Sequence, residues 1–264
     1  MKYILITGAG GGMGRATAER LASKGYTVFA LDKSASEATE NIIPIQADVT
    51  DEESVRLAFE KIREITDELF AIIHFAGLYM LDSLVEMETE AYDRIFDVNV
   101  RGVYLINKVF LPLLRSGSRI VITTSELAPL DPLPFTGIYA ITKAALDKYA
   151  YSLRMELQLL GIHVSVLRAG AVSTSMLGAS TTALDRFCKE TKLYSCNAKR
   201  FKAIVENVEA RNVPPEKISK KVHSIISKKN PHFAYSINRN PLLLMLDFLP
   251  SSIQFFVIRM ILRP

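Results

Sequence analysis

The stretch TGAGGGMG at residues 7–14 decides the fold because of what flanks it on both sides. The apolar run YILIT at residues 3–7 leads into it and is typical of a buried strand. An amphipathic stretch at residues 14–24 follows and is typical of a helix. Glycines let the backbone turn sharply and approach a pyrophosphate, whose charge then lies at the helix N-terminus. A strand, a TGxxxGxG loop and a helix in this order predict a dinucleotide-binding site.

Strand-like and helix-like segments alternate outward from this loop through the first 170 residues. Short apolar runs predict strands at residues 3–7, 27–31, 42–47, 70–75, 119–123 and 163–168. Amphipathic stretches predict helices at residues 14–24, 52–69 and 139–160. This alternation predicts an α/β fold, a Rossmann-type doubly wound parallel sheet with its ligand beyond the carboxyl ends of the strands.

The last third of the chain has a different character. Residues from about 173 to 212 are rich in Ser, Thr and Lys without a strong period, which predicts a mobile segment over a substrate site. Residues 214–229 have helical periodicity, and an apolar extension follows at residues 241–264. Because no linker separates these parts, we predict a single domain over residues 1–264.

The composition excludes several classes of protein. Of the 264 residues, 49% are hydrophobic, which suffices for the core of one α/β domain, and a net charge of +4 indicates no nucleic-acid partner. The two cysteines, Cys188 and Cys196, form no disulfide framework, and the four histidines show no metal-ligand spacing. Since the apolar runs are also too short to span a membrane, we expect a cytoplasmic protein without a metal.

Two acidic residues at predicted strand ends bear on the choice of cofactor. Asp32 follows the second strand, where a carboxylate can accept hydrogen bonds from both adenosine ribose hydroxyls and repels a 2′-phosphate. It favours NAD over NADP, although the neighbouring Lys33 could pair with that phosphate. Asp48 follows the third strand and could hold the adenine amino group. The local sequence fits a helix cap equally well.

Tyr139 and Lys143 lie four residues apart on a predicted helix, so their side chains share one face. A phenol titrates near a pKa of about 10, too high for easy proton exchange at neutral pH. An ammonium about 4 Å away favours the phenolate by roughly 4 kcal/mol at an effective dielectric constant of about 20. We therefore expect Lys143 to lower the pKa of Tyr139, which could then protonate a carbonyl oxygen or deprotonate an alcohol.

Two further residues support this chemistry. Ser125 lies just past the fifth strand, 14 residues before Tyr139, where its hydroxyl could orient a substrate oxygen. Asn99 lies on a predicted helix beside that of Tyr139. Together with the glycine loop, these residues resemble the motifs of the short-chain dehydrogenase/reductase family, from residue 2 to about residue 174 and more loosely to the end.

The resemblance implies a role for each of these side chains. Its catalytic tetrad would be Asn99, Ser125, Tyr139 and Lys143. Tyr139 would act as acid and base, and Ser125 would hold the substrate oxygen. Lys143 would bind the nicotinamide ribose, and Asn99 would steady a proton-relay water.

The resemblance also implies the cofactor contacts. Asp48 and Val49 match the segment that contacts adenine, Val172 the residue that contacts nicotinamide, and Thr174 the residue at its carboxamide. The complete set of expected cofactor residues is Gly8, Gly10, Gly12, Met13, Gly14, Asp32, Asp48, Val49, Ala76, Gly77, Tyr139, Lys143, Val172 and Thr174.

Three residues depart from the family pattern. His74 stands where an Asn is usual after the fourth strand, so it must replace the structural hydrogen bonds of that Asn. Ala169 stands where a proline is usual beside the nicotinamide segment. Glu126 follows Ser125, where a small or apolar residue is usual, and could reach the substrate pocket.

The apolar extension has three interpretations. It could pack on its own subunit or on a dimer partner, lie on a membrane surface as amphipathic helices, or line the mouth of a hydrophobic pocket. It resembles the tails of retinol and hydroxysteroid dehydrogenases, which implies a bulky apolar substrate such as a steroid, a retinoid or a fatty-acyl derivative. The family resemblance further implies a homodimer or homotetramer.

Two hypotheses of different kinds follow from the sequence. The first is an NAD(P)-dependent oxidoreductase that interconverts a secondary alcohol and a ketone by hydride transfer. The second is a non-catalytic regulatory protein that keeps the fold and binds the nucleotide. Proteins of the second kind commonly lack the Tyr or the Lys, and this chain has both.

Overall fold

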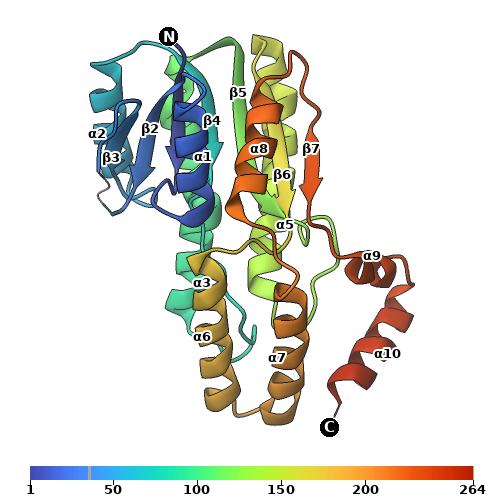
Figure 1. Cartoon of the computed structure of the whole chain (residues 1–264). Coiled ribbons are helices and arrows are strands. Elements are labelled where there is room, and N and C mark those ends of the chain that lie inside the picture. The colour runs from blue at the N-terminus through green and yellow to red at the C-terminus, as the bar shows by residue number, and fades with distance from the viewer. Residues whose placement is uncertain (35–36, 264) are drawn as a thin grey trace.

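The computed structural model describes residues 1–34 and 37–263, and in them seven strands form one parallel sheet (Figure 1). The strand order is β3-β2-β1-β4-β5-β6-β7. The strands are β1 (Tyr3–Thr7), β2 (Thr27–Asp32), β3 (Ile42–Gln46), β4 (Leu69–His74), β5 (Leu114–Ser125), β6 (His163–Ala169) and β7 (Ala234–Ile237). All six predicted strands are confirmed, and so is the Rossmann-type fold.

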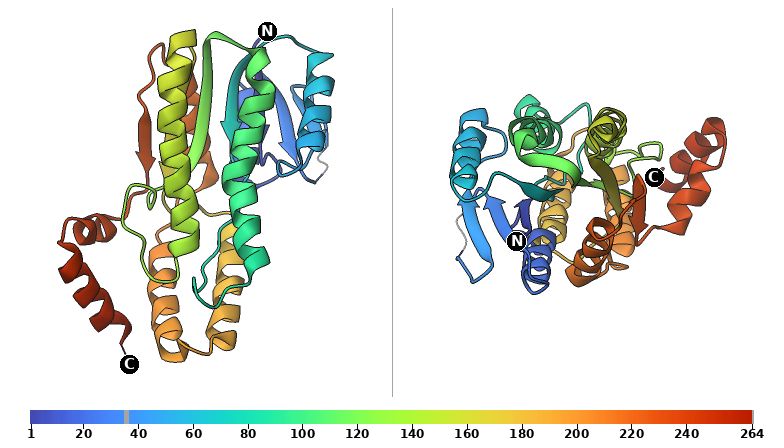
Figure 2. Two further views of the ribbon diagram at one scale, coloured as in Figure 1. Left: turned by 180° about the vertical axis from the view of Figure 1, so that it is seen from behind. Right: turned by 90° about the horizontal axis from the view of Figure 1, so that it is seen from above.

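Helices cover both faces of the sheet (Figure 2). One face carries α1 (Gly12–Ala22) and α8 (Pro215–Ile226). The other carries α2 (Glu52–Arg63), α4 (Gly102–Phe110) and α5 (Gly137–Leu157). Coverage on both sides explains why the central strands read as continuous apolar runs rather than as alternating ones.

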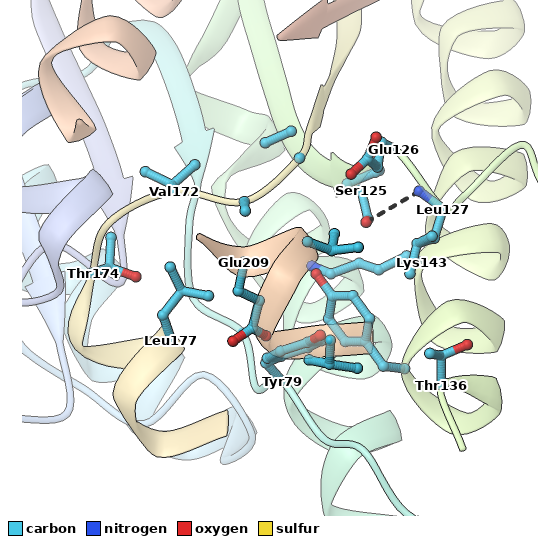
Figure 3. A pocket seen from close by; sticks show the side chains of 18 of the residues that line it. Tyr79, Ser125, Glu126, Leu127, Thr136, Lys143, Val172, Thr174, Leu177 and Glu209 are labelled. Carbon is cyan, nitrogen blue, oxygen red and sulfur yellow. Dashed lines mark hydrogen bonds between the residues drawn. The ribbon is translucent and has the colours of Figure 1, made fainter. Parts of the chain in front are cut away.

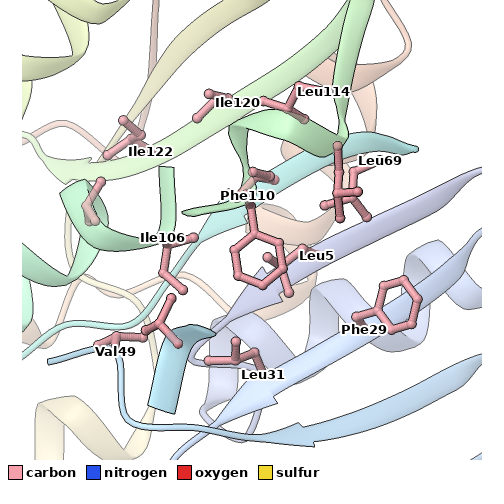
Figure 4. Packing of buried hydrophobic residues seen from close by; sticks show 14 of the residues in the cluster. Leu5, Phe29, Leu31, Val49, Leu69, Ile106, Phe110, Leu114, Ile120 and Ile122 are labelled. Carbon is pink, nitrogen blue, oxygen red and sulfur yellow. The ribbon is translucent and has the colours of Figure 1, made fainter. Parts of the chain in front are cut away.

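The largest core cluster lies between the sheet and the helices α2, α4 and α5 (Figure 4). Phe110 of α4 is fully buried and packs edge-to-face on Phe59 of α2, with ring centroids 5.5 Å apart. Leu5, Ile72 and Ile120 bring three adjacent strands into the same cluster. Each such side chain contributes about 1.5–3 kcal/mol by leaving water. This packing fixes the strand ends that carry the site.

Several predicted boundaries differ from the structure. The helix predicted over residues 52–69 ends at Arg63, because β4 already begins at Leu69. The strand predicted over residues 119–123 runs from Leu114 to Ser125 and so includes the candidate serine in its last position. The helix predicted from residue 139 begins two residues earlier, at Gly137.

The segment from 173 to 212 is mostly helical. It forms α6 (Ser175–Glu190) and α7 (Ser195–Glu209), which extend beyond the carboxyl edge of the sheet (Figure 1). The Glu86 carboxylate holds the connection between them, since it accepts hydrogen bonds from the Thr191 hydroxyl and from the amides of Lys192 and Leu193 at 2.7, 2.8 and 3.1 Å. The mobility of this segment stays a prediction.

The strand β7 was not predicted, because only four residues form it, and among the described strands it pairs with β6 alone. Beyond it lie α9 (Pro241–Asp247) and α10 (Ser251–Leu262), which project beside α7, while residue 264 lies outside the described residues (Figure 1). α10 is fixed at its end, where Leu262 is buried and its carbonyl accepts a 2.7 Å hydrogen bond from Asn197 of α7. Among the described residues, no helix combines the length and hydrophobicity that crossing a bilayer requires.

Candidate active site

The glycine loop closes on itself and on the end of β4. Gly8 has a φ of 68°, a conformation that disfavours other residues. A Cβ added to it would lie 2.5 Å from the Ala76 amide nitrogen, and a Cβ at Gly14 would lie 2.1 Å from the Gly8 carbonyl oxygen. The loop therefore needs glycine at both positions for its own packing.

The other two predicted loop glycines face cofactor candidates. A Cβ at Gly12 would lie 2.7 Å from the Thr174 methyl group, and one at Gly10 would lie 3.1 Å from the Asp32 carboxylate. The helix α1 begins at Gly12 without a side-chain cap and without an acidic residue in its first turn. Its first amide groups thus lack side-chain acceptors, which fits the pyrophosphate of a dinucleotide.

Asp32 closes the far end of this loop. Its Oδ2 accepts a 2.9 Å hydrogen bond from the Gly10 amide, and its Oδ1 accepts one of 3.1 Å from the Ser34 amide. The neighbouring Lys33 forms an ion pair of 2.8 Å with Asp48. The Lys33 ammonium, which could have paired with a 2′-phosphate, therefore contacts the Asp48 carboxylate.

Asp48 stabilises the turn after β3. Its Oδ1 accepts hydrogen bonds from the amide and hydroxyl of Thr50 at 2.9 and 2.7 Å. The hydrogen bond from Lys33 and those from Thr50 lower the pKa of Asp48 to about 2. The interpretation of Asp48 as the cap of the following helix is wrong, because Asp51 caps α2 by accepting from the Glu53 amide at 3.0 Å. Val49 packs against Gly102 of α4.

Ser125, Tyr139 and Lys143 meet at the carboxyl end of β5. Ser125 is the last residue of that strand, and the other two lie one turn apart on α5. The Ser125 hydroxyl oxygen accepts a 3.2 Å hydrogen bond from the Leu127 amide (Figure 3). The Lys143 ammonium lies 5.6 Å from the centre of the Tyr139 ring and donates to the Thr123 carbonyl at 3.2 Å.

The expectation that Lys143 lowers the pKa of Tyr139 is wrong for this structure. Burial raises the pKa of the Tyr139 phenol to about 12, and hydrogen bonding with Ser125 opposes that rise only in part. Burial also lowers the pKa of the Lys143 amine to about 8. Desolvation penalises the charged form of both groups and is the largest cause of both shifts in pKa.

Asn99 lies within a short π-helical segment, residues Asp97–Arg101, between α3 (Thr89–Phe96) and α4. Its side chain is fully buried and receives a 2.7 Å hydrogen bond from the Leu78 amide. Its amide group donates to the Leu78 carbonyl and to the Thr142 hydroxyl, both at 3.0 Å. Asn99 thereby joins the loop after β4 to α5, next to Lys143.

The segment after β6 brings Val172 and Thr174 to the same region. Val172 is buried and forms a bridge with Val213, and Thr174 directly precedes α6. Asn238, which follows β7, fixes this segment by donating to the carbonyls of Ala171 and Arg211 at 2.9 and 2.8 Å. Ala169 stays within β6, so the missing proline leaves the strand intact.

These elements enclose a pocket that opens to solvent (Figure 3). The expected site residues that line it are Met13, Gly77, Ser125, Tyr139, Lys143, Val172 and Thr174. The other expected residues lie outside its wall: the loop glycines, Asp32, Asp48 and Val49 follow the edge of the sheet toward β3, and Ala76 and Asn99 lie behind it. Apart from three ionisable residues, Glu126, Glu209 and Lys143, the wall is mostly apolar.

The structure adds wall residues that sequence reasoning did not identify. Phe201, Ile204, Val205 and Val208 of α7 face the pocket, as do Leu177 of α6 and Leu243 of α9. The spacing of the α7 residues is helical, and that period was the signal that could have revealed them. The contribution of Leu243 shows that the apolar extension does line the pocket, while its end packs on α7.

His74 has a structural role. It is buried at the end of β4, and its Nε2 lies 3.0 Å from the Asn107 Oδ1 of α4. Asn107 in turn donates to the Tyr149 hydroxyl of α5 at 3.2 Å. Burial lowers the pKa of His74 to about 4, so the ring stays neutral. His74 does not line the pocket, in agreement with its interpretation as a replacement for a structural Asn.

The fold and the residues gathered at this site are those expected of a dinucleotide-dependent oxidoreductase. The family model described as short chain dehydrogenase matches residues 2–185. The chain belongs to the short-chain dehydrogenase/reductase family, and it is therefore an NAD(P)-dependent enzyme that acts on CH–OH groups.

Several relatives cover most of the chain. It is 30% identical to estradiol 17-beta-dehydrogenase 2 of Mus musculus over 98% of this chain and 74% of that protein. It is 27% identical to 3-ketodihydrosphingosine reductase of Bacteroides thetaiotaomicron over 88% of this chain and 86% of that protein. Among solved structures, 3-ketoacyl-(acyl-carrier-protein) reductase from Brucella melitensis complexed with NADH has a TM-score of 0.73 at 23% identity and covers 89% of this chain and 96% of its own, a likeness of fold.

Proposed function

We propose that this protein interconverts a secondary alcohol and a ketone, with NAD as its cofactor and a bulky apolar molecule as its substrate. One observation carries the proposal: the Tyr139 phenol and the Ser125 hydroxyl open into a mostly apolar pocket whose wall also includes Met13 and Thr174 from the cofactor side. Bound NAD accepts or returns a hydride at its nicotinamide ring.

The protein's own residues would move the proton. In the reductive direction Tyr139 donates its proton to the carbonyl oxygen, and its raised pKa keeps it protonated at neutral pH. Ser125 holds that oxygen from the opposite side. Lys143 supplies a positive charge beside the phenolate that forms, and Asn99 keeps α5 in register with the loop after β4.

Two features support NAD over NADP. The Asp32 carboxylate ends β2 and accepts a hydrogen bond from the Gly10 amide, so it lies beside the glycine loop, where the adenosine ribose would follow the pyrophosphate. Lys33 is paired with Asp48 at 2.8 Å, so a 2′-phosphate would compete with that carboxylate for the lysine. A carboxylate at this position accepts hydrogen bonds from the ribose hydroxyls and repels a phosphate.

The lining of the pocket supports a bulky apolar substrate. Side chains of α6, α7 and α9 form an aliphatic and aromatic wall opposite Ser125. A steroid, a retinoid and a long acyl chain all present the surface that such a wall buries. The estradiol dehydrogenase and ketodihydrosphingosine reductase among the relatives act on molecules of this kind by name.

A substrate panel tests the proposal. Secondary alcohols with NAD or NADP, and ketones with the reduced forms, are followed by the absorbance of the reduced nicotinamide. We expect turnover of apolar alcohols with NAD. The second candidate, a regulatory nucleotide-binding protein, predicts tight NADH binding with no turnover across the whole panel.

The proposal includes peripheral contact with a membrane. The exposed apolar residues of α9, α10 and the turn between them are Leu242, Met245, Phe248, Leu249, Ile253, Phe255, Phe256, Met260 and Ile261. Arg259 and Arg263 lie near the end of the same segment, where cations favour anionic headgroups. Such contact would bring α9, which shares the pocket wall, to the lipid surface. We also expect a homodimer or homotetramer, as is common in this family.

A further inference from the structure

Glu126 places an acidic group beside the position proposed for the reacting oxygen. It directly follows Ser125, lines the pocket and is only 8% exposed (Figure 3). Burying a carboxylate in apolar surroundings is unfavourable unless partners compensate for the lost water. The partners of this side chain therefore indicate what it is for.

The contacts within the protein compensate for the charge of Glu126 only in part. Its Oε2 accepts a 2.5 Å hydrogen bond from the Asn240 amide at the start of α9. Arg239 attracts the charge more weakly, and burial still raises the pKa of the carboxyl group above its usual value. In the described part of the chain, no lysine or arginine forms an ion pair with it.

The other oxygen of Glu126 lies against a glycine of the pocket wall. A Cβ added to Gly170 would lie 2.9 Å from Oε1, so a side chain there would push against the carboxylate. The negative charge also reaches the reacting centre, because it contributes to the raised pKa of Tyr139. A positive group on the substrate would compensate for the buried charge of Glu126 and would reduce its effect on the Tyr139 phenol.

We propose that Glu126 is a specificity-determining residue that selects ketones and alcohols with an amine on the carbon next to the reacting one. The inference rests on the proposed function. With the substrate oxygen between Ser125 and Tyr139, a neighbouring ammonium lies beside residue 126 and donates a hydrogen bond to the carboxylate. The apolar wall, with Phe201, Val205 and Leu243, then receives the hydrocarbon part of the same molecule.

A purely structural role for Glu126 makes different predictions. In that case the carboxylate would only anchor the Asn240 amide and so hold α9 in place. Glu126→Gln keeps an oxygen that can accept this hydrogen bond and removes the charge. Asn240→Pro removes the donor and leaves the charge, and the φ of −83° at residue 240 is close to the value that proline requires.

The test compares three long-chain ketones with the full-length protein and NADH: a 2-amino-3-ketone, the matched 2-hydroxy-3-ketone and the plain 3-ketone. We expect the wild type to prefer the amino ketone by kcat/KM. Glu126→Gln should lower the ratio between the amino and plain ketones by about 10- to 100-fold, as for loss of a hydrogen bond to a charged group. Asn240→Pro and Glu209→Gln, which alters the other pocket carboxylate, should keep the ratio.

A pH profile tests the separate premise that the charge of Glu126 reaches the Tyr139 phenol. Oxidation of an alcohol needs the Tyr139 phenolate, so its kcat/KM rises with pH toward the pKa of that group. Because the Glu126 charge raises this pKa, Glu126→Gln should shift the rise to lower pH.

The inference is overturned if the wild type turns over the plain ketone and shows no preference for the amine. It is also overturned if it prefers the hydroxy ketone, or if Asn240→Pro or Glu209→Gln abolishes the preference and Glu126→Gln does not. A wild type that turns over no ketone or alcohol with either nicotinamide contradicts the proposed function itself. That outcome is therefore distinct from those that overturn only the inference about Glu126.

Discussion

The Asp147 carboxylate and the Arg168 guanidinium form a two-pronged ion pair that joins α5 to β6, with nitrogen–oxygen distances of 2.5 and 3.1 Å. Their side chains are only 10% and 23% exposed. The Thr124 hydroxyl also donates to Asp147, at 3.3 Å. Since Asp147 lies one turn beyond Lys143, this pair fixes the helix that carries both catalytic candidates.

Asp147→Asn should destabilise the fold. It keeps the shape of the side chain and leaves the guanidinium without a counter-charge, which costs about 3 kcal/mol in a buried pair. Urea unfolding at neutral pH measures the loss. Glu52→Gln is the matched control, because it breaks an ion pair with Lys108 in which both side chains are 52% exposed. An equal effect of the two variants would contradict the prediction.

Tyr139→Phe should abolish turnover while NAD binding changes little. The variant removes the hydroxyl that exchanges the proton and keeps the ring, which stacks edge-to-face on Tyr79 with centroids 4.6 Å apart. Loss of a general acid and base typically lowers kcat by about 10²- to 10⁴-fold. Steady-state assays and fluorescence titration with NADH measure the two properties. Undiminished activity would refute the assignment of Tyr139.

Lys143→Met should inactivate the enzyme and stabilise the fold at neutral pH. Burial lowers the pKa of this amine from 10.5 to about 8, so between these values the unfolded chain holds a proton that the folded chain has lost. The stability contributed at this site therefore rises with pH from about 8 to about 10.5. Below pH 8 the buried ammonium costs up to about 3 kcal/mol, which the methionine removes.

Denaturant unfolding at several pH values checks the effect of Lys143→Met. The gain in the free energy of unfolding should be largest at pH 7 and should shrink as the pH approaches about 10.5. A variant that is less stable than the wild type at pH 7 would show that the contact of Lys143 with the Thr123 carbonyl outweighs the burial of its charge.

Asp32→Asn should weaken the preference for NAD. The amide oxygen can still accept from Gly10, so the loop keeps its shape, and the repulsion of a 2′-phosphate disappears. We expect the ratio of kcat/KM for NAD to that for NADP to fall at least about tenfold, or about 1.4 kcal/mol. Lys33→Ala should have less effect, because that lysine pairs with Asp48. A wild type that uses NADP as well as NAD would refute the assignment.

The combined variant Phe255→Ser and Phe256→Ser should reduce binding to anionic vesicles. These rings are 74% and 62% exposed on α10, so the substitutions disturb little of the core. Flotation with vesicles of phosphatidylserine and phosphatidylcholine measures binding. Leu159→Ser is the matched control, since Leu159 is 83% exposed and lies on a different part of the molecule, just after α5. A wild type that does not float with the vesicles would rule out the membrane contact.

The sequence revealed those parts of the molecule that depend on neighbours along the chain. The glycine loop after β1 and the spacing of Tyr139 and Lys143 are local patterns, and the structure has them where they were expected. The residue Ser125 could be predicted for the same reason, since it directly follows an apolar run that is buried on both faces.

What the sequence did not reveal depends on contacts between distant segments. The pairing of Asp147 with Arg168 needs the register of α5 against β6, and the contact between Glu126 and Asn240 joins residues 114 positions apart. The pKa of Tyr139 was predicted in the wrong direction, because spacing gives the distance to a charge but not the degree of burial. The polar residues on the surface of α7 also obscured the helical spacing of its apolar residues in the sequence.

The position of β7 in the sequence affects how the nascent chain folds during synthesis. This strand, which among the described residues pairs only with β6, comes from residues 234–237, so the ribosome releases it only after the 64 residues that separate it from β6. Until then the backbone amides and carbonyls along one side of β6 lack partners, and an open strand edge of this kind invites pairing with other chains. Premature termination before residue 234 would therefore yield an aggregation-prone fragment, whereas termination after residue 240 would leave the described sheet complete.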